Sequence, residues 1–261
     1  MKIDLEEAQN EFIKYTEKFN LEDKNIKRKQ LHSLRVMNNA KQIATNLKLS
    51  EEQVQIATLI GLLHDIGRFK QYTEIGMGDN LEGFDHGDYG AKILFEDGMI
   101  RKFIEPSKYD EIIREAIKNH NKFSIEDGLT EEELIFAKLI RDADKLDILY
   151  ESVEIFYKGQ EEKINKSILS YKTYNQFMNK ILVKKEKNIK LEYIDNIICI
   201  LAFIFDINYV ASFQILKQKD YINSILNRYN FEDTKTQEMV NEIRKLANEY
   251  VTSKIKNDLK C

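Results

Sequence analysis

The residues of this chain that could do chemistry are gathered in its first half. It has four histidines: His32, His64, His86 and His120. Asp65 directly follows His64, and a further aspartate, Asp144, comes after the last histidine. Imidazole nitrogens and carboxylate oxygens together suit one or two divalent ions of Mn, Fe, Co, Ni or Zn. The order H…HD…H…H…D therefore predicts a metal centre, although no single member of the set indicates one alone.

The elements that must position these residues are predicted to be helices. Three segments pair a capping hydroxyl with an acid or amide three residues later, which is typical of helix starts: Ser50 with Gln53, Ser107 with Asp110, and Thr130 with Glu133. Each predicted helix carries candidate ligands toward its far end. An earlier helix, about residues 24–47, places His32 in phase with its apolar positions. All four helices thus direct their candidates toward the core.

Two segments refine this picture. Residues 54–66 are apolar almost all round, so we expect a central buried helix that ends in His64-Asp65. Burying an imidazole and a carboxylate there is unfavourable unless they bond each other or bind a metal. Residues 71–89 are rich in glycine, and we expect a mobile loop over the site that enters a helix near Asp88.

Each candidate also has an ordinary structural explanation. His32 alone is typical of a core histidine whose hydrogen bonds are satisfied. His86 fits a solvated turn, and His120 fits the favourable position of a cation at a helix end. Asp144 fits an ion-pair run with Arg141 and Lys145. The combination favours the metal site, because chance does not direct so many polar side chains inward from separate helices.

Basic residues divide into two groups. Four of them precede His32 and are expected to form a solvated helix face: Lys24, Lys27, Arg28 and Lys29. Arg35 lies one turn after His32, Arg68 three residues after Asp65, and Lys145 directly after Asp144. We expect these three to contact phosphate, with structural ion pairing as the open alternative.

Bulk properties place the chain among ordinary globular proteins. Its 261 residues suffice for a large core, and with 43% hydrophobic and 32% charged residues and a single proline we expect one all-α domain over residues 1–261. The net charge of −4 argues against a nucleic-acid polymer as ligand. The apolar stretch between Asp195 and Asp206 is too short to cross a bilayer. No signal-peptide pattern opens the chain, and its two cysteines form no recognisable framework, so we expect a cytoplasmic protein with no membrane partner. The oligomeric state is left open.

Three segments resemble the HD superfamily of metal-dependent phosphohydrolases. They are His32-Ser33-Leu34-Arg35-Val36, Gly61-Leu62-Leu63-His64-Asp65-Ile66-Gly67-Arg68-Phe69 and Asp142-Ala143-Asp144-Lys145-Leu146-Asp147. The resemblance covers about residues 26–151. It implies an HD-domain helical bundle with the metal in its core, followed by a C-terminal helical extension over about residues 152–261.

The same resemblance implies a division of the ligands. His32, His64 and Asp144 would hold the first ion, with Asp142 as the competing choice for the last ligand. Family members with two further histidines between HD and the last aspartate hold two ions. His86 and His120 occupy those places, so we expect a second ion there, with Asp65 bridging the two.

The activity that the resemblance implies is hydrolysis of a phosphate ester or anhydride of a nucleotide or similar small phosphorylated metabolite. Asp65, Arg68 and Lys145 would be the catalytic residues, and Arg35, Arg68 and Lys145 would bind the substrate. The Gly-Tyr-Pro signature of cyclic-di-GMP phosphodiesterases is absent. Two alternatives stay open, a mixed-valent di-iron oxygenase with the same ligands and a non-catalytic nucleotide-sensing module.

Overall fold

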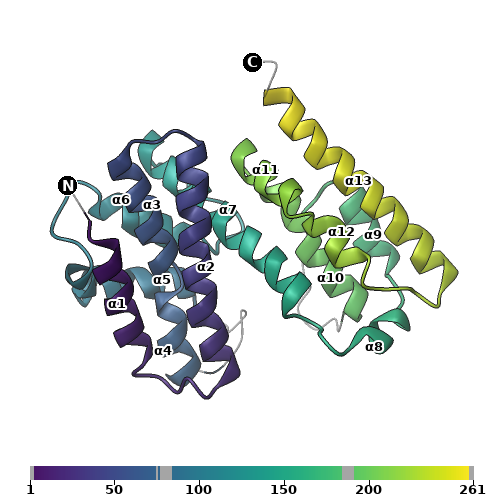
Figure 1. Cartoon of the computed structure of the whole chain (residues 1–261), viewed down its shortest axis with the longest axis horizontal. Helices are drawn as coiled ribbons and strands as arrows, with labels where there is room; N and C mark the ends of the chain where they lie inside the picture. The colour runs from purple at the N-terminus through teal and green to yellow at the C-terminus, as the bar shows by residue number, and fades with distance from the viewer. Residues whose placement is uncertain (1–2, 75, 77–83, 184–190, 259–261) are drawn as a thin grey trace. The chain divides into compact units, whose positions relative to one another are not determined.

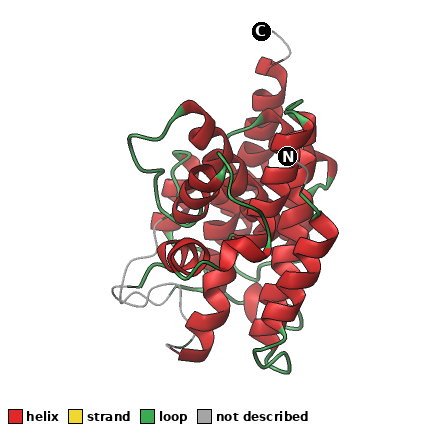
Figure 2. Ribbon diagram, turned by 90° about the vertical axis from the view of Figure 1, so that its left-hand side faces the viewer, coloured by secondary structure: helices red, strands yellow, loops and turns green. Residues whose placement is uncertain are grey.

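A computed structural model describes residues 3–74, 76, 84–183 and 191–258 of the chain. The described residues form helices joined by turns and loops, with no strand among them (Figures 1 and 2). The predicted all-α class is therefore confirmed. The chain divides into two compact units, Met1–Asp147 and Ile148–Cys261. Each unit is considered by itself below, and the single-domain organisation expected from the sequence stays a prediction.

The first unit contains the candidate ligands. Its elements are α1 (Leu5–Thr16), α2 (Lys24–Asn46), α3 (Glu51–Leu63), α4 (Ile66–Glu74), α5 (His86–Ala91), the π-helical turn η1 (Lys92–Glu96), the 3-10 turn η2 (Met99–Lys102), α6 (Asp110–Asn119) and the part of α7 (Glu131–Glu154) that ends at Asp147.

Helices α2 and α3 form the centre of this unit. Ser50 and Gln53 make the predicted capping box at the start of α3. Every residue of α3 from Ile56 to Leu63 is buried, as its apolar sequence predicts. Gly61 lets the two backbones approach closely, because a Cβ there would lie 2.8 Å from the Cα of Met37 on α2. This contact brings the end of α3 against the helix that carries His32.

A break between α3 and α4 exposes no polar group to the solvent. His64 and Asp65 form a turn between the two helices, and both are buried. Helix α4 then packs against α5 at Gly67, where a Cβ would lie 2.7 Å from the main-chain oxygen of His86. Glycine at this position therefore sets the distance between the His64-Asp65 turn and the next histidine.

Three predicted boundaries differ from the structure. Helix α5 begins at His86, two residues before the predicted start near Asp88. Asp85 caps it by accepting hydrogen bonds from the main-chain nitrogens of Gly87 and Asp88. Ser107 does not cap α6, which begins at Asp110. The glycine-rich segment begins later than predicted, since α4 continues to Glu74; residues 75 and 77–83 of the predicted mobile loop lie outside the described residues.

The second unit is also helical. Its elements are α8 (Glu161–Asn165), α9 (Tyr171–Met178), α10 (Tyr193–Leu201), the 3-10 turn η3 (Ala202–Asp206), α11 (Val210–Gln218), α12 (Tyr221–Leu226) and α13 (Thr234–Asp258). The apolar stretch before Asp206 forms α10 and η3, and most of its residues are buried. Among the described residues, no helix is both long and apolar enough to span a membrane.

Candidate metal centre

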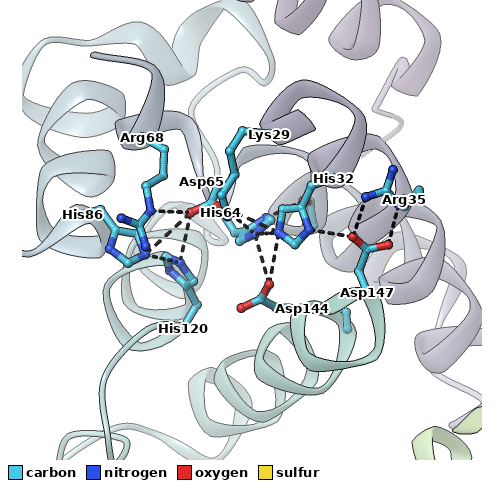
Figure 3. A network of polar contacts seen from close by, with 12 residues as sticks. Lys29, His32, Arg35, His64, Asp65, Arg68, His86, His120, Asp144 and Asp147 are labelled. Carbon is cyan, nitrogen blue, oxygen red and sulfur yellow. Dashed lines mark hydrogen bonds and ion pairs between the residues drawn. The ribbon is translucent and has the colours of Figure 1, made fainter. Parts of the chain in front are cut away.

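The four histidines and two aspartates that the sequence singles out meet in the interior of the first unit (Figure 3). His32 comes from the middle of α2, and His64-Asp65 from the turn after α3. His86 is the first residue of α5, His120 follows the last residue of α6, and Asp144 comes from α7. Five helices therefore contribute to one cluster of imidazole and carboxylate groups.

One half of the cluster consists of His32, His64 and Asp144. The Nε2 atoms of the two histidines lie 3.2 Å apart. Oδ1 of Asp144 lies 3.1 Å from Nε2 of His32 and 3.8 Å from Nε2 of His64. One ligand atom from each of these residues lies within 4.8 Å of the other two, so the group could hold a metal ion.

The other half consists of His86 and His120. Their Nε2 atoms lie 3.1 Å apart. His64, Asp65 and His120 form another group that could hold an ion, again with the ligand atoms within 4.8 Å of one another.

Asp65 joins the two halves. Its Oδ2 lies 3.6 Å from Nε2 of His32 and 3.5 Å from Nε2 of His64. Its Oδ1 lies 3.6 Å from Nε2 of His86 and 3.6 Å from Nε2 of His120. Each carboxylate oxygen thus faces one histidine pair, which is the arrangement that a bridging carboxylate requires.

Three of the rings make a hydrogen bond through Nδ1, the outer nitrogen that faces away from the cluster, and this bond holds Nε2 in place. Nδ1 of His64 donates to the main-chain oxygen of Gly61 at 2.8 Å, and Nδ1 of His120 donates to that of Ile117 at 2.6 Å. Nδ1 of His32 donates to Oδ2 of Asp147 at 2.6 Å. These bonds fix the tautomer and direct Nε2 into the cluster.

Buried charge in the cluster is balanced by a lysine. Nζ of Lys29 lies 2.6 Å from Oδ2 of Asp65, and the lysine side chain is only 12% exposed. Burial opposes ionisation of Asp65, but Lys29 and the neighbouring imidazoles outweigh it and hold the pKa of the carboxyl well below its usual range. Burial likewise opposes the charge of Lys29, while Asp65 and Asp144 raise its pKa. The ammonium and the carboxylate therefore stay ionised together.

The histidines differ in their affinity for protons. Burial lowers the pKa of His64 to about 4. Burial and the nearby His120 hold the pKa of His86 well below its usual value. For His32, burial and Lys29 favour the neutral ring, but hydrogen bonds to Asp144 and Asp147 outweigh them and raise its pKa. A ring that is neutral near pH 7 keeps a lone pair for a metal ion.

Comparison with protein families identifies one domain in the chain. Residues 31–149, a little under half of the sequence, match the HD domain. This part of the chain is an HD domain. Comparisons with curated proteins and with solved structures find no match. The predicted membership of the HD superfamily is thus confirmed, and the family is mostly one of metal-dependent hydrolases.

The donor set of this HD domain fits a divalent ion. Without one, the structure brings two pairs of imidazole Nε2 atoms to within 3.2 Å and 3.1 Å of each other, beside the carboxylate of Asp65, in the interior of the first unit. Such a close approach of nitrogens is unfavourable unless a proton or a metal cation lies between them. The nitrogen and oxygen donors suit Mn, Fe, Co, Ni and Zn, and the number of ions stays a prediction.

The predicted phosphate-binding residues lie in different surroundings. Arg68 is at the centre, with Nε 3.6 Å from Oδ1 of Asp65 and Nη1 donating to Gln71. Arg35 instead makes two hydrogen bonds to Asp147, on the outer side of His32, as a structural ion pair would. Lys145 is buried and donates to the main-chain oxygen of Arg141 at 3.4 Å. Arg68 thus contacts a candidate ligand, Asp65; substrate roles stay predictions for all three residues.

The structure also places Asp144 and Asp142, the two candidates for the last metal ligand, differently. Asp144 faces His32 and His64, whereas Asp142 is fully buried on the same helix and belongs to neither histidine group. Asp144 is therefore the better placed of the two to act as the last ligand.

Sequence reasoning missed four residues that shape the centre: Lys29, Asn121, Arg141 and Asp147. Lys29 was expected on a solvated face, and that expectation is wrong. Arg141, which entered the sequence analysis only in the alternative explanation of Asp144, donates to the main-chain oxygens of Asn119, Lys122 and Phe123 and so holds the segment around His120. Asp147 had a signal, since it follows Asp144 by three residues and lies on the same helix face.

Proposed function

We propose that this protein is a metal-dependent phosphohydrolase that cleaves a phosphate ester or anhydride of a nucleotide or similar small metabolite. The observation that carries the proposal is the position of Asp65, with one oxygen toward each histidine pair. Two ions held by one carboxylate are the arrangement found in many enzymes that displace groups at phosphorus.

Each half of the cluster would hold one ion. His32, His64 and Asp144 would bind the first, and His86 and His120 the second, with Asp65 shared between them. When bound, divalent ions supply a water of lowered pKa and positive charge for the phosphate oxygens.

The protein's own cations would complete the site. The guanidinium of Arg68 and the ammonium of Lys29 approach Asp65 from its two oxygens, and both side chains are largely buried. Planar guanidinium groups match phosphate geometry, and a buried cation stabilises developing negative charge more than an exposed one. Arg68 would therefore orient the phosphoryl group, and Lys29 would offset charge on the other side of the carboxylate.

Rigid support favours catalysis over simple binding. The Nδ1 atoms of His32, His64 and His120 each donate to a fixed acceptor of the first unit. Polar groups that are held in place before the reaction do not need to reorganise when charge develops, and this preorganisation lowers the barrier.

The test is phosphate release from a panel of nucleotides, cyclic nucleotides, dinucleotides and sugar phosphates, with Mn²⁺ or Fe²⁺ supplied. We expect turnover by the wild type and a loss of at least about 100-fold in His64→Ala. Asn38→Ala removes an exposed amide on the same helix as His32 and should keep full activity.

The opposite results have clear meanings. Metal-loaded protein that releases no phosphate from any compound contradicts the proposal. Iron-dependent oxygen uptake with a polyol or organophosphonate would then assign the centre to oxygenase chemistry, which the same ligands allow.

A further inference from the structure

The outer nitrogens, Nδ1, of the four histidines have different kinds of hydrogen-bond partner. Those of His32, His64 and His120 each face an oxygen that can only accept a hydrogen bond. Each of these rings therefore carries its proton on Nδ1. In the neutral form, its Nε2 enters the cluster as a bare lone pair.

His86 has a different outer partner. Its Nδ1 lies 3.2 Å from Nδ2 of Asn121, and the same Nδ2 donates to Oδ1 of Asp85 at 3.0 Å. Reversing the amide would set its oxygen against the carboxylate oxygen of Asp85, so the nitrogen must point this way. The amide thus presents an N–H to Nδ1 of His86 and favours the tautomer whose proton is on Nε2.

This tautomer is unsuited to a metal ion. Nε2 of His86 points at Nε2 of His120, 3.1 Å away, and can donate its proton to the lone pair there. To bind an ion, His86 must move the proton to Nδ1 and give up its hydrogen bond from Asn121. The other three rings need no such change.

The outer partner of His32 has the opposite effect and favours metal binding. Its outer partner Asp147 is a buried carboxylate, which Arg35 holds through two hydrogen bonds of 2.7 and 2.9 Å. A carboxylate on the outer nitrogen makes an imidazole a stronger ligand than a main-chain oxygen does, and its removal commonly weakens metal binding 10–100-fold. Through these two bonds, Arg35 holds the carboxylate that accepts from the His32 ring.

We propose that Asp147 and Asn121 are positioning residues that give the two halves of the centre unequal affinity for metal. Asp147 makes the half with His32 the tighter one, and Asn121 makes the half with His86 the weaker one. One ion is then retained while the other exchanges with the surroundings. This inference rests on the metal centre of the proposed function and does not depend on the reaction that the centre catalyses.

The experiment is a titration of the full-length, metal-free protein with Mn²⁺, in which bound metal is measured at each free concentration. The electron paramagnetic resonance signal distinguishes an isolated Mn²⁺ from a neighbouring pair. We expect the wild type to load in two steps. Asp147→Asn should raise the Mn²⁺ concentration of the first step about 10- to 100-fold. Asn121→Ala should lower that of the second step about fivefold.

Two further variants protect the test against misfolding. Arg35→Lys keeps the charge but loses the paired hydrogen bonds, and it should weaken the first step by less than Asp147→Asn. Asn38→Ala removes an exposed amide outside the centre and should leave both steps at the wild-type values. Opposite shifts in the Asp147 and Asn121 variants cannot come from a general loss of structure.

Three results would overturn the inference: a single loading step in the wild type, an unchanged or weaker second step in Asn121→Ala, or a first step that does not move in Asp147→Asn. The proposed function fails separately. Two-step loading without phosphate release would refute the hydrolase and leave the inequality intact, whereas phosphate release with single-step loading would do the reverse.

Discussion

The two histidine pairs are at similar distances but are supported by different kinds of structure. His32 lies within α2, a helix of 23 residues, and His64 directly follows α3, a helix of 13 residues; both rings are fully buried. His86 begins the six-residue helix α5, and His120 follows the ten-residue helix α6. The first pair is thus carried by longer helices than the second.

Polar contacts also support the second pair. Asp85 caps α5 and also accepts from Asn121, which contacts His86. Arg141 holds the carbonyl groups beside His120. Short helices open more easily than long buried ones, so the second half of the centre should be the easier one to lose.

The largest effect should come from removing one ligand of the second pair. His120→Ala is expected to reduce bound metal from two ions per chain toward one, because the remaining ring of His86 cannot hold an ion with Asp65 alone. Metal analysis after dialysis, together with circular dichroism, measures both content and fold. We expect the helical signal to survive, since α2 and α3 are untouched.

The matched variant is His64→Ala, which removes a ligand of the first pair. The variant should lose the more tightly bound ion, and with it the release of phosphate. Unchanged metal content in His120→Ala would contradict a two-ion centre.

The sequence predicts the first pair better than the second for the same structural reason. Apolar periodicity over a long helix shows which face is buried, so the predicted inward position of His32 on α2 is confirmed. The Ser50 capping box and the apolar run after it place His64 at the end of α3. Helix α5 is too short for periodicity, and its start depends on the cap at Asp85 within a glycine-rich segment.

Pairings between distant residues were beyond sequence analysis. Lys29 and Asp65 are 36 positions apart, and Arg35 and Asp147 are 112 apart. In the sequence, Lys29 is one of several basic residues near the start of a helix, which favours a solvated face. Only the packing of α2 against the turn after α3 shows that this lysine points inward.

A smaller effect is expected from Lys29→Met, and it should be largest in the metal-free protein. Without the ammonium, the buried carboxylate of Asp65 has lost its closest cation, and breaking such a pair costs about 3 kcal/mol of unfolding free energy. Bound metal would supply positive charge in its place and reduce the loss. Urea unfolding with and without Mn²⁺ measures the difference.

The control for this variant is Lys41→Met on the exposed side of the same helix, which should change stability by less than about 0.5 kcal/mol in both states. An equal loss with and without metal would show that Lys29 acts through packing and not through the charge of Asp65.

The smallest effect is the pH dependence of the unfolding free energy, to which the histidines contribute in different directions. Burial lowers the pKa of His64 from 6.5 to about 4, so the unfolded chain binds a proton more readily between these values. The stability that the neutral ring contributes is therefore complete above about pH 6.5 and is lost as the pH falls toward 4. His86 acts in the same direction. His32, whose pKa is raised by Asp144 and Asp147, acts in the opposite one, because its contribution is present at low pH and is lost as the pH rises.

Because the pKa values of His64 and His86 are lowered and only that of His32 is raised, we expect the metal-free protein to lose stability between about pH 7 and pH 5. Urea unfolding at several pH values measures this slope. His64→Gln should reduce it, because the glutamine cannot take up a proton, whereas Asp147→Asn should steepen it by weakening the one histidine that gains stability in acid. A slope that Asp147→Asn leaves unchanged would mean that the carboxylate orients His32 without favouring its charge.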